Sequence, residues 1–325
     1  EAATIDKWQD HRLLAVDGSV TQLPISNELL EHFGKARSHA AMPHVRLSQL
    51  YDVNNNITLD LQVESHSTGE REMALKHLNK TKAGDLIVYD RGYPAVWFYK
   101  YHKLQNVDFC MRIVKSSNVV KAFLESGKYS DVVDFPCIEK SLRRCRKDKI
   151  STESLQLRLV RVDLPSGEPE ILVSSLTDLQ AYPTAIFADL YFQRWGVEED
   201  YKVLKSRLNI ENYSSVSVEG ILQDLHAKLL TKNLAASAIH DAKRKIKKPK
   251  KNRLYDYKIN FTFAINQLKD NVVRFTMKLA DIELYELLIS KISKSLSVIR
   301  PNRKFVRQDR RNKTNKYPMN YKRMC

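Results

Sequence analysis

Cysteine is scarce in this chain, and long apolar runs are missing. The four cysteines stand at positions 110, 137, 145 and 325, with no C-x-x-C pair and no regular spacing. This pattern supports neither a zinc ribbon nor a disulfide framework, and it fits a reducing cytoplasm. No apolar run reaches the roughly 18 residues that a membrane span needs. We therefore expect a cytoplasmic protein with no membrane partner.

The beginning of the chain, EAATIDKWQD, has neither the apolar region of a signal peptide nor an initiator methionine. We expect a fragment or a processed chain whose natural beginning is missing. With 325 residues, the chain is long enough to bury a full core. It can form one large domain with additions, or two domains.

Acidic residues are too few to balance the basic ones. The chain has 54 Lys and Arg against 38 Asp and Glu, which gives a net charge of +16. This balance favours a polyanionic partner, nucleic acid first. Basic side chains concentrate in 143–149, in 243–253 and after Arg300. For 243–253 and the tail, a solvated charged segment is an equally good explanation, because the cations repel one another unless phosphate neutralises them.

Two short apolar runs each lead to an acid. Residues 12–16 read RLLAV and precede Asp17 and Gly18, and residues 85–90 read DLIVYD and end at Asp90. Both runs are typical of buried strands, and an acid at the end of a strand can project into a cleft. Taken alone, Asp17 followed by glycine is more typical of a simple turn.

Further strands and helices complete a recognisable order. Alternating apolar residues in 57–64 predict a hairpin with 45–53. Ser67 and Glu70 form a capping box that predicts a helix directly after it. An aromatic-rich helix around Trp97 and a strand at 107–114 follow. The order β-β-β-α-β-α-β is that of a ribonuclease H-like core, an α/β fold with a mixed five-stranded sheet and flanking helices.

The rest of the chain divides into segments of different character. Residues 1–114 form the first part of the core, and 115–178, with short strands and charged turns, form a β-rich insertion. Residues 179–242 return to the core with a helix over 191–208. Residues 243–325 form a helical C-terminal region with a basic tail, which we expect to stay disordered until a polyanion binds.

The helix predicted over 191–208 places four polar side chains together. Tyr191, Arg194, Glu198 and Lys205 stand at offsets of 0, 3, 7 and 14. On one continuous α-helix they fall within a stripe roughly 60° wide. A Glu with Arg four residues before it is also a common pair on helix surfaces, so the stripe alone does not identify a site.

A glycine within this predicted helix lowers its stability. Gly196 is less favourable than Ala by about 1 kcal/mol in a helix interior. We expect another part of the chain to approach the backbone closely there.

Three acids therefore stand on elements of one predicted core: Asp17, Asp90 and Glu198. Hard divalent cations such as Mg²⁺ prefer oxygen ligands. A pair of such ions about 3.5–4 Å apart can activate a water or a 3′-hydroxyl and stabilise the leaving oxygen of a phosphodiester. Arg194 and Lys205 would hold backbone phosphates beside them.

The chain resembles the DDE transposases of bacterial insertion sequences, in the insertion sequence 4 branch, over roughly residues 10–240. The resemblance depends on three motifs. They are Asp17-Gly18-Ser19, Asp-x-Gly-Tyr from Asp90 to Tyr93, and Tyr-x2-Arg-x3-Glu-x6-Lys from Tyr191 to Lys205. The last motif is specific, and the first two are weak alone.

The resemblance implies roles for these residues. Asp17, Asp90 and Glu198 would bind Mg²⁺, with two ions expected and Mn²⁺ able to substitute. Tyr191, Arg194 and Lys205 would contact DNA near the scissile phosphate. The activity would be DNA strand cleavage and strand transfer during transposition, within a homodimer that bridges transposon ends and target DNA in the bacterial nucleoid.

Two departures from the family pattern limit what the resemblance implies. Only sixteen residues precede Asp17, so recognition of transposon ends is expected to lie outside this chain. No Trp lies in the predicted insertion, so a hairpin mechanism has no assigned stacking residue. Two alternatives stay open: an inactive or truncated DNA-binding transposase remnant, and a host nuclease of ribonuclease H-like fold.

Overall fold

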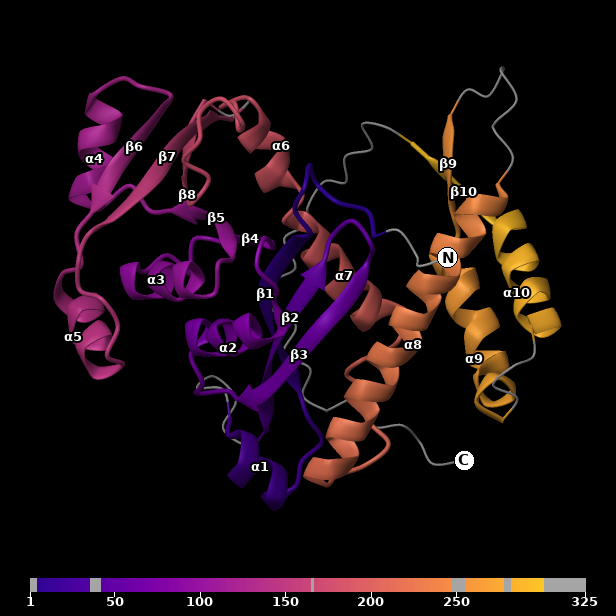
Figure 1. Cartoon of the computed structure of the whole chain (residues 1–325). Coiled ribbons are helices and arrows are strands. Elements are labelled where there is room, and N and C mark those ends of the chain that lie inside the picture. The colour runs from indigo at the N-terminus through magenta and orange to yellow at the C-terminus, as the bar shows by residue number, and fades with distance from the viewer. Residues whose placement is uncertain (1–4, 36–41, 165–166, 247–254, 278–281, 301–325) are drawn as a thin grey trace. The chain divides into compact units, whose positions relative to one another are not determined.

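The structure, a computed structural model, describes residues 5–35, 42–164, 167–246, 255–277 and 282–300 (Figure 1). The chain forms two compact units. The first comprises residues 1–21, 33–38 and 44–201, and the second comprises 22–32, 39–43 and 202–325. Within the described part, no helix combines the length and the apolar character needed to cross a membrane.

The first unit is built on one mixed sheet of eight strands, in the order β3-β2-β1-β4-β5-β8-β7-β6. The strands are β1 (Leu13–Gln22), β2 (His44–Asp52), β3 (Ile57–Ser65), β4 (Leu86–Tyr89), β5 (Asp108–Ile113), β6 (Ser130–Phe135), β7 (Leu155–Asp163) and β8 (Pro169–Ser174). Strand β4 pairs parallel with both β1 and β5. The pairs β2–β3, β5–β8, β8–β7 and β7–β6 are antiparallel.

Seven helices accompany these strands along the chain. They are α1 (Asn27–Phe33), α2 (Glu70–His77), α3 (Val96–Leu104), α4 (Asn118–Glu125), α5 (Glu139–Lys147), α6 (Ile186–Phe192) and α7 (Trp195–Ser206), and a 3₁₀ turn, Leu78–Lys80, extends α2. Helix α7 begins in the first unit and ends in the second.

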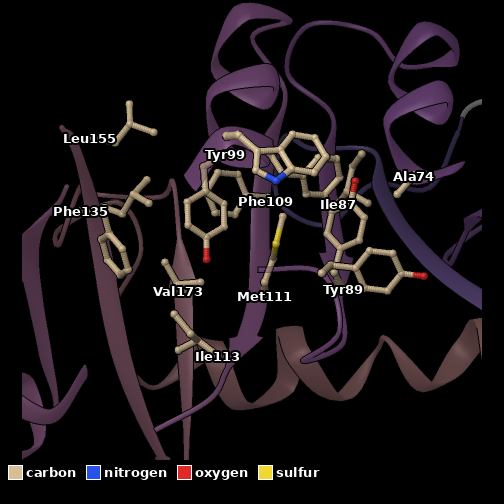
Figure 2. Packing of buried hydrophobic residues seen from close by; sticks show 14 of the residues in the cluster. Ala74, Ile87, Tyr89, Tyr99, Phe109, Met111, Ile113, Phe135, Leu155 and Val173 are labelled. Carbon is tan, nitrogen blue, oxygen red and sulfur yellow. The ribbon is translucent and has the colours of Figure 1, made fainter. Parts of the chain in front are cut away.

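One face of the sheet carries the main apolar core. Figure 2 shows Ile87, Phe109 and Met111 among the side chains on this face. The ring of Tyr99 from α3 stacks on Phe109, with ring centroids 4.9 Å apart. Burial of each such side chain contributes about 1.5–3 kcal/mol. Because strand side chains alternate between the two faces, the residues between these core positions point to the opposite face.

Helix α6 covers that opposite face. Arg158 of β7 is 1% exposed, and its guanidinium lies 4.8 Å from the ring centroid of Phe187 in α6. The same guanidinium donates to the Tyr182 carbonyl at 2.6 Å. The helices that follow the sheet in sequence therefore pack on the face that the main core leaves free.

Several expectations from the sequence are wrong. The sheet has eight strands rather than five because β8 pairs with β5 and adds the strands of the 115–178 segment to the same sheet. The basic run at 143–149 lies largely in helix α5 instead of a charged turn. Helix α2 starts at Glu70 after Gly69 and has no side-chain cap, so the capping box is wrong. The four-part division into domains stays a prediction.

The predicted helix over 191–208 is in fact two helices. Helix α6 ends at Phe192 and α7 begins at Trp195. At the junction, Arg194 N–H donates to the Tyr191 carbonyl and Gly196 N–H to the Gln193 carbonyl. These three-residue steps tighten the backbone and end the first helix. Tyr191 therefore lies on a different helix from Glu198.

The second unit is largely helical. Helix α8 (Val218–Lys245) starts at the predicted cap Ser217, whose hydroxyl accepts from Gly220 N–H at 3.2 Å. Helices α9 (Phe261–Met277) and α10 (Ile282–Lys294) pack against α8. Strands β9 (Asp256–Ile259) and β10 (Leu296–Ile299) pair antiparallel, where the sequence predicted only helix. The basic segment at 247–253 and the tail from 301 lie outside the described residues.

Candidate active site

The register between β1 and β4 brings two of the predicted acids together. The last paired residues of these parallel strands are Val16 and Tyr89, so Asp17 and Asp90 follow at equivalent positions. Neighbouring strands lie about 4.8 Å apart, and residues in register point to the same face. Asp17 does not end its strand, since β1 continues to Gln22. The pairing with β4 ends there instead.

Helix α7 brings the third acid to this edge of the sheet. The Tyr201 hydroxyl donates to the Asp17 carbonyl at 3.2 Å, which fixes α7 beside β1. A Cβ on Gly196 would lie 3.2 Å from Cγ1 of Val53, so the expected close approach at this glycine is confirmed. Glu198, two residues after Gly196, therefore lies on the helix segment held against the sheet.

Electrostatics link the three acids. The pKa of Asp17 is raised from 3.8 to about 6, mainly by burial and also by the charges of Glu198 and Asp90. A hydrogen bond from Gly18 N–H and the charge of Arg194 oppose this rise. Carboxylates perturb one another in this way only at short range. The structure thus brings Asp90 and Glu198 each within electrostatic reach of Asp17.

Tyr191 and Arg194 lie beside these acids. The Tyr191 hydroxyl donates to Asp90 Oδ1 at 3.3 Å, and Arg194 Nη1 lies 2.8 Å from Glu198 Oε1. Arg194 is only 5% exposed, and its guanidinium lies 5.1 Å from the Trp195 ring centroid. Its buried Nε–H has no hydrogen-bond partner among the described residues. Five of the six predicted site residues therefore lie at one place.

Residues 8–234 match the family model of the transposase DDE domain. The chain belongs to this family of DDE transposases. Its curated relatives include the transposase for insertion sequence element IS231E of Bacillus thuringiensis subsp. finitimus, 22% identical over 80% of this chain and 62% of that protein. Transposase InsG for insertion sequence element IS4 of Escherichia coli (strain K12) is 24% identical over 70% of this chain and 52% of that protein.

The match to these transposases is partial in length. The chain spans between about half and three-fifths of the curated relatives' length. Among solved structures, a piggyBac transposase synaptic complex with hairpin DNA is similar, with a TM-score of 0.48 and 11% identity. That alignment covers 90% of this chain and 59% of that one.

The sixth predicted residue, Lys205, belongs to the second unit. It lies in the last turn of α7, and its ammonium group is 3.8 Å from the Glu211 carboxylate. Its side chain is 38% exposed. The predicted contact of Lys205 with DNA stays a prediction.

The acids of this transposase domain offer oxygen donors suited to a hard divalent cation. Across the ranges that the structure describes, no group of three or more His, Cys, Asp or Glu side chains stands close enough to enclose a metal ion. Glu198 Oε1 is paired with Arg194. The buried, like-charged environment raises the pKa of Asp17, and a bound cation would relieve this. The carboxylate oxygens of these residues are therefore suitable ligands for Mg²⁺. Glu198 would have to leave its ion pair with Arg194 to bind the ion.

Sequence reasoning missed two residues at this site. Glu70 was assigned to a helix cap, and Tyr93 was noted only as part of the Asp-x-Gly-Tyr motif. The pKa of Tyr93 lies well above its usual range because of burial and the charges of Asp17, Glu70 and Asp90. The position of Tyr93 three residues after Asp90 could have indicated that Tyr93 lies near this acid. Glu70 had none, since its contacts are with residues remote in sequence.

Proposed function

We propose that this transposase domain catalyses metal-dependent cleavage of DNA strands and their transfer during transposition of an insertion sequence. The observation that supports this most is the convergence of Asp17, Asp90 and Glu198 at one edge of the sheet. The DNA substrates would be transposon ends and target DNA, held by a homodimer in the nucleoid.

We propose that the catalytic core is ribonuclease H-like. Strands β3-β2-β1-β4-β5 are consecutive in the sheet, and β1, β4 and β5 run parallel. In such sheets, functional groups gather beyond the carboxyl ends of the parallel strands. Asp17 and Asp90 stand where the pairing of β1 with β4 ends, which agrees with this rule.

Asp17, Asp90 and Glu198 would hold the metal. When bound, Mg²⁺, or Mn²⁺ in its place, would activate the attacking water or 3′-hydroxyl and stabilise the leaving oxygen, with two ions proposed. Tyr191 orients Asp90 through its hydroxyl. To bind the ion, the Glu198 carboxylate would have to leave its ion pair with Arg194. A DNA phosphate could replace Glu198 as the anionic partner of Arg194.

Arg194 is suited to contact that phosphate. Its Nε–H is buried without a partner, and a guanidinium can bind two phosphate oxygens at once. The aromatic rings of Tyr191 and Trp195 flank the guanidinium. Because these contacts hold the guanidinium in place, little conformational freedom is lost when the phosphate binds. Lys205, on the same helix, would add a second cation.

A DNA-binding remnant without nuclease activity is the second candidate. The observation that favours it is the ion pair between Glu198 and Arg194, which occupies one oxygen of the third acid. A remnant would bind DNA through the same basic residues but would not bind Mn²⁺ at the acids. A host nuclease would cut DNA without joining strands.

The variant Glu198→Gln tests the catalytic proposal. Glutamine keeps an oxygen that can accept from Arg194 but removes the charge that a cation needs. We expect loss of Mg²⁺- and Mn²⁺-dependent nicking and joining of transposon-end oligonucleotides by the full chain, with DNA binding retained. The matched control is Glu199→Gln, which changes an exposed acid next along α7. Undiminished nicking by Glu198→Gln would exclude this mechanism.

A further inference from the structure

A fourth carboxylate lies beside the two segments that carry Asp17 and Asp90. Glu70 is the first residue of α2. A Cβ on Gly18 would lie 3.3 Å from Glu70 Oε1, and a Cβ on Gly92 would lie 3.7 Å from Glu70 Oε2. These glycines come one residue after Asp17 and two residues after Asp90. The absence of side chains at both glycines leaves room for the Glu70 carboxylate beside both segments.

Neighbouring residues hold Glu70 in this position. Arg46 of β2 places Nη1 2.6 Å from Glu70 Oε1, and its Nε donates to the His66 carbonyl. Arg71, the next residue of α2, donates to the Gly92 carbonyl at 2.9 Å. The Glu70 side chain is still 44% exposed. Its second oxygen is therefore available for a further ligand.

Tyr93 provides an independent observation at the same place. The residue is 2% exposed, and its buried hydroxyl has no hydrogen-bond partner among the described residues. Its ring is held against Tyr89, with ring centroids 5.1 Å apart. The charged groups that act on the hydroxyl are the carboxylates of Asp17, Asp90 and Glu70 and the guanidinium of Arg46.

A buried hydroxyl without a partner is unfavourable and therefore rare. Here the unsatisfied donor lies among carboxylates, the groups that bind both O–H donors and hard cations. A cation held by these carboxylates would bring an acceptor to the hydroxyl. The free donor is therefore consistent with a site that is completed on binding.

We infer that Glu70 is a fourth carboxylate of the divalent-cation site, and that Tyr93 is a positioning residue whose hydroxyl donates to the acids that hold the ion. This rests on the proposed function, because it takes Asp17 and Asp90 as ligands of the cation. A merely structural Arg46–Glu70 ion pair would be independent of metal.

The first test measures Mn²⁺ binding to the full chain by electron paramagnetic resonance of the free ion. We expect Glu70→Gln to weaken Mn²⁺ affinity about tenfold, the size usual for residues that support a metal site. The matched control is Glu72→Gln on the same helix. The Glu72 side chain is 45% exposed and pairs with Arg144 at 2.6 Å. Glu72→Gln therefore removes a comparable ion pair that does not involve Asp17 or Asp90. Its affinity should stay within about twofold of the unchanged protein.

The second test uses Tyr93→Phe, which removes only the hydroxyl. Without metal, the thermal midpoint should not fall, because an unsatisfied donor disappears. Mn²⁺ affinity should fall about tenfold. A purely structural tyrosine would give the reverse result, a lower midpoint with unchanged affinity, and that result would overturn the role of Tyr93.

A third variant separates this inference from the proposed function. If Asp17→Asn abolishes Mn²⁺ binding while Glu70→Gln binds as well as the unchanged protein, the fourth carboxylate is wrong and the proposed function stands. If Asp17→Asn also leaves Mn²⁺ binding unchanged, the proposed metal site itself is wrong. Weaker binding by both variants, with Glu72→Gln unaffected, supports both proposals.

Discussion

At the scale of single residues, burial makes the charged form of Asp17 unfavourable. Its pKa is raised from 3.8 to about 6, first by burial. The folded protein therefore binds a proton more readily than the unfolded chain between about pH 4 and pH 6. The contribution of Asp17 to the free energy of unfolding therefore falls as pH rises through this window, by about 3 kcal/mol for a shift of this size.

The variant Asp17→Asn should remove this loss. Without metal at pH 7, we expect the free energy of unfolding to rise by about 1–3 kcal/mol. Urea unfolding in EDTA at several pH values measures this. The dependence on pH between about 4 and 6 should flatten. Asp10→Asn, at an exposed acid in a turn of the same unit, should keep the original pH dependence. A less stable Asp17→Asn protein would contradict the prediction.

Burial also decides how the motif of Tyr191, Arg194 and Glu198 is interpreted. The spacing of Arg194 and Glu198 predicted their contact, and the 2.8 Å pair agrees. The alternative of a common surface pair is wrong, because Arg194 is 5% exposed. Sequence spacing gives the contact but not the burial, since burial depends on neighbours that are remote along the chain.

At the scale of secondary-structure elements, strands were predicted better than helix ends. Alternation of apolar residues is a local signal, and it located β3 and its partner β2. The break between α6 and α7 was missed because no Pro or Gly stands at Gln193 or Arg194. The turn there follows from tertiary contacts, among them the bond from the Tyr191 hydroxyl to Asp90.

At Gly196 in α7, helix propensity and side-chain packing have opposite effects on the stability of an alanine variant. In an exposed helix, alanine would be more stable than glycine by about 1 kcal/mol. Here a Cβ would lie 3.2 Å from Val53 Cγ1 and 3.6 Å from Tyr51 Cε1. Overpacking costs about 1–3 kcal/mol. We therefore expect Gly196→Ala to lower the free energy of unfolding by about 1 kcal/mol, as measured by urea unfolding.

A second substitution identifies the cause. Val53→Ala removes the methyl group that the new Cβ would meet. The double variant Val53→Ala with Gly196→Ala should be more stable than the sum of the single effects, with a coupling of at least about 0.5 kcal/mol. Additive effects would show that the contact with Val53 is not what makes glycine necessary at position 196.

At the scale of the whole molecule, the second unit includes a segment that the sequence did not connect with it. Residues 22–32 belong to the second unit. The Ser26 hydroxyl donates to the Val216 carbonyl at 3.0 Å, and Val218 N–H donates to Glu28. These partners are 190 residues apart in sequence. No local sequence pattern predicts contacts between residues so far apart. The domains predicted from the sequence therefore did not group residues 22–32 with the C-terminal part of the chain.

The net charge of +16 also acts at this scale. Proteins that neutralise DNA phosphates release counterions, so the logarithm of the binding constant falls with the logarithm of salt concentration by about 0.9 per phosphate. Residues 301–325 contain nine Lys or Arg and one Asp. If these cations meet phosphate, they steepen the salt dependence. If water alone surrounds them, they do not change it.

We expect the tail to bind phosphate. Truncation after Arg300 should reduce the log–log salt slope of duplex DNA binding by at least about 3, which corresponds to the loss of a few phosphate contacts. Fluorescence anisotropy between low and moderate salt measures the slope. A full-length variant with all nine basic residues of 301–325 replaced by Gln controls for chain length and should match the truncation. An unchanged slope in both variants would show a solvated tail and would restrict DNA binding to the rest of the chain.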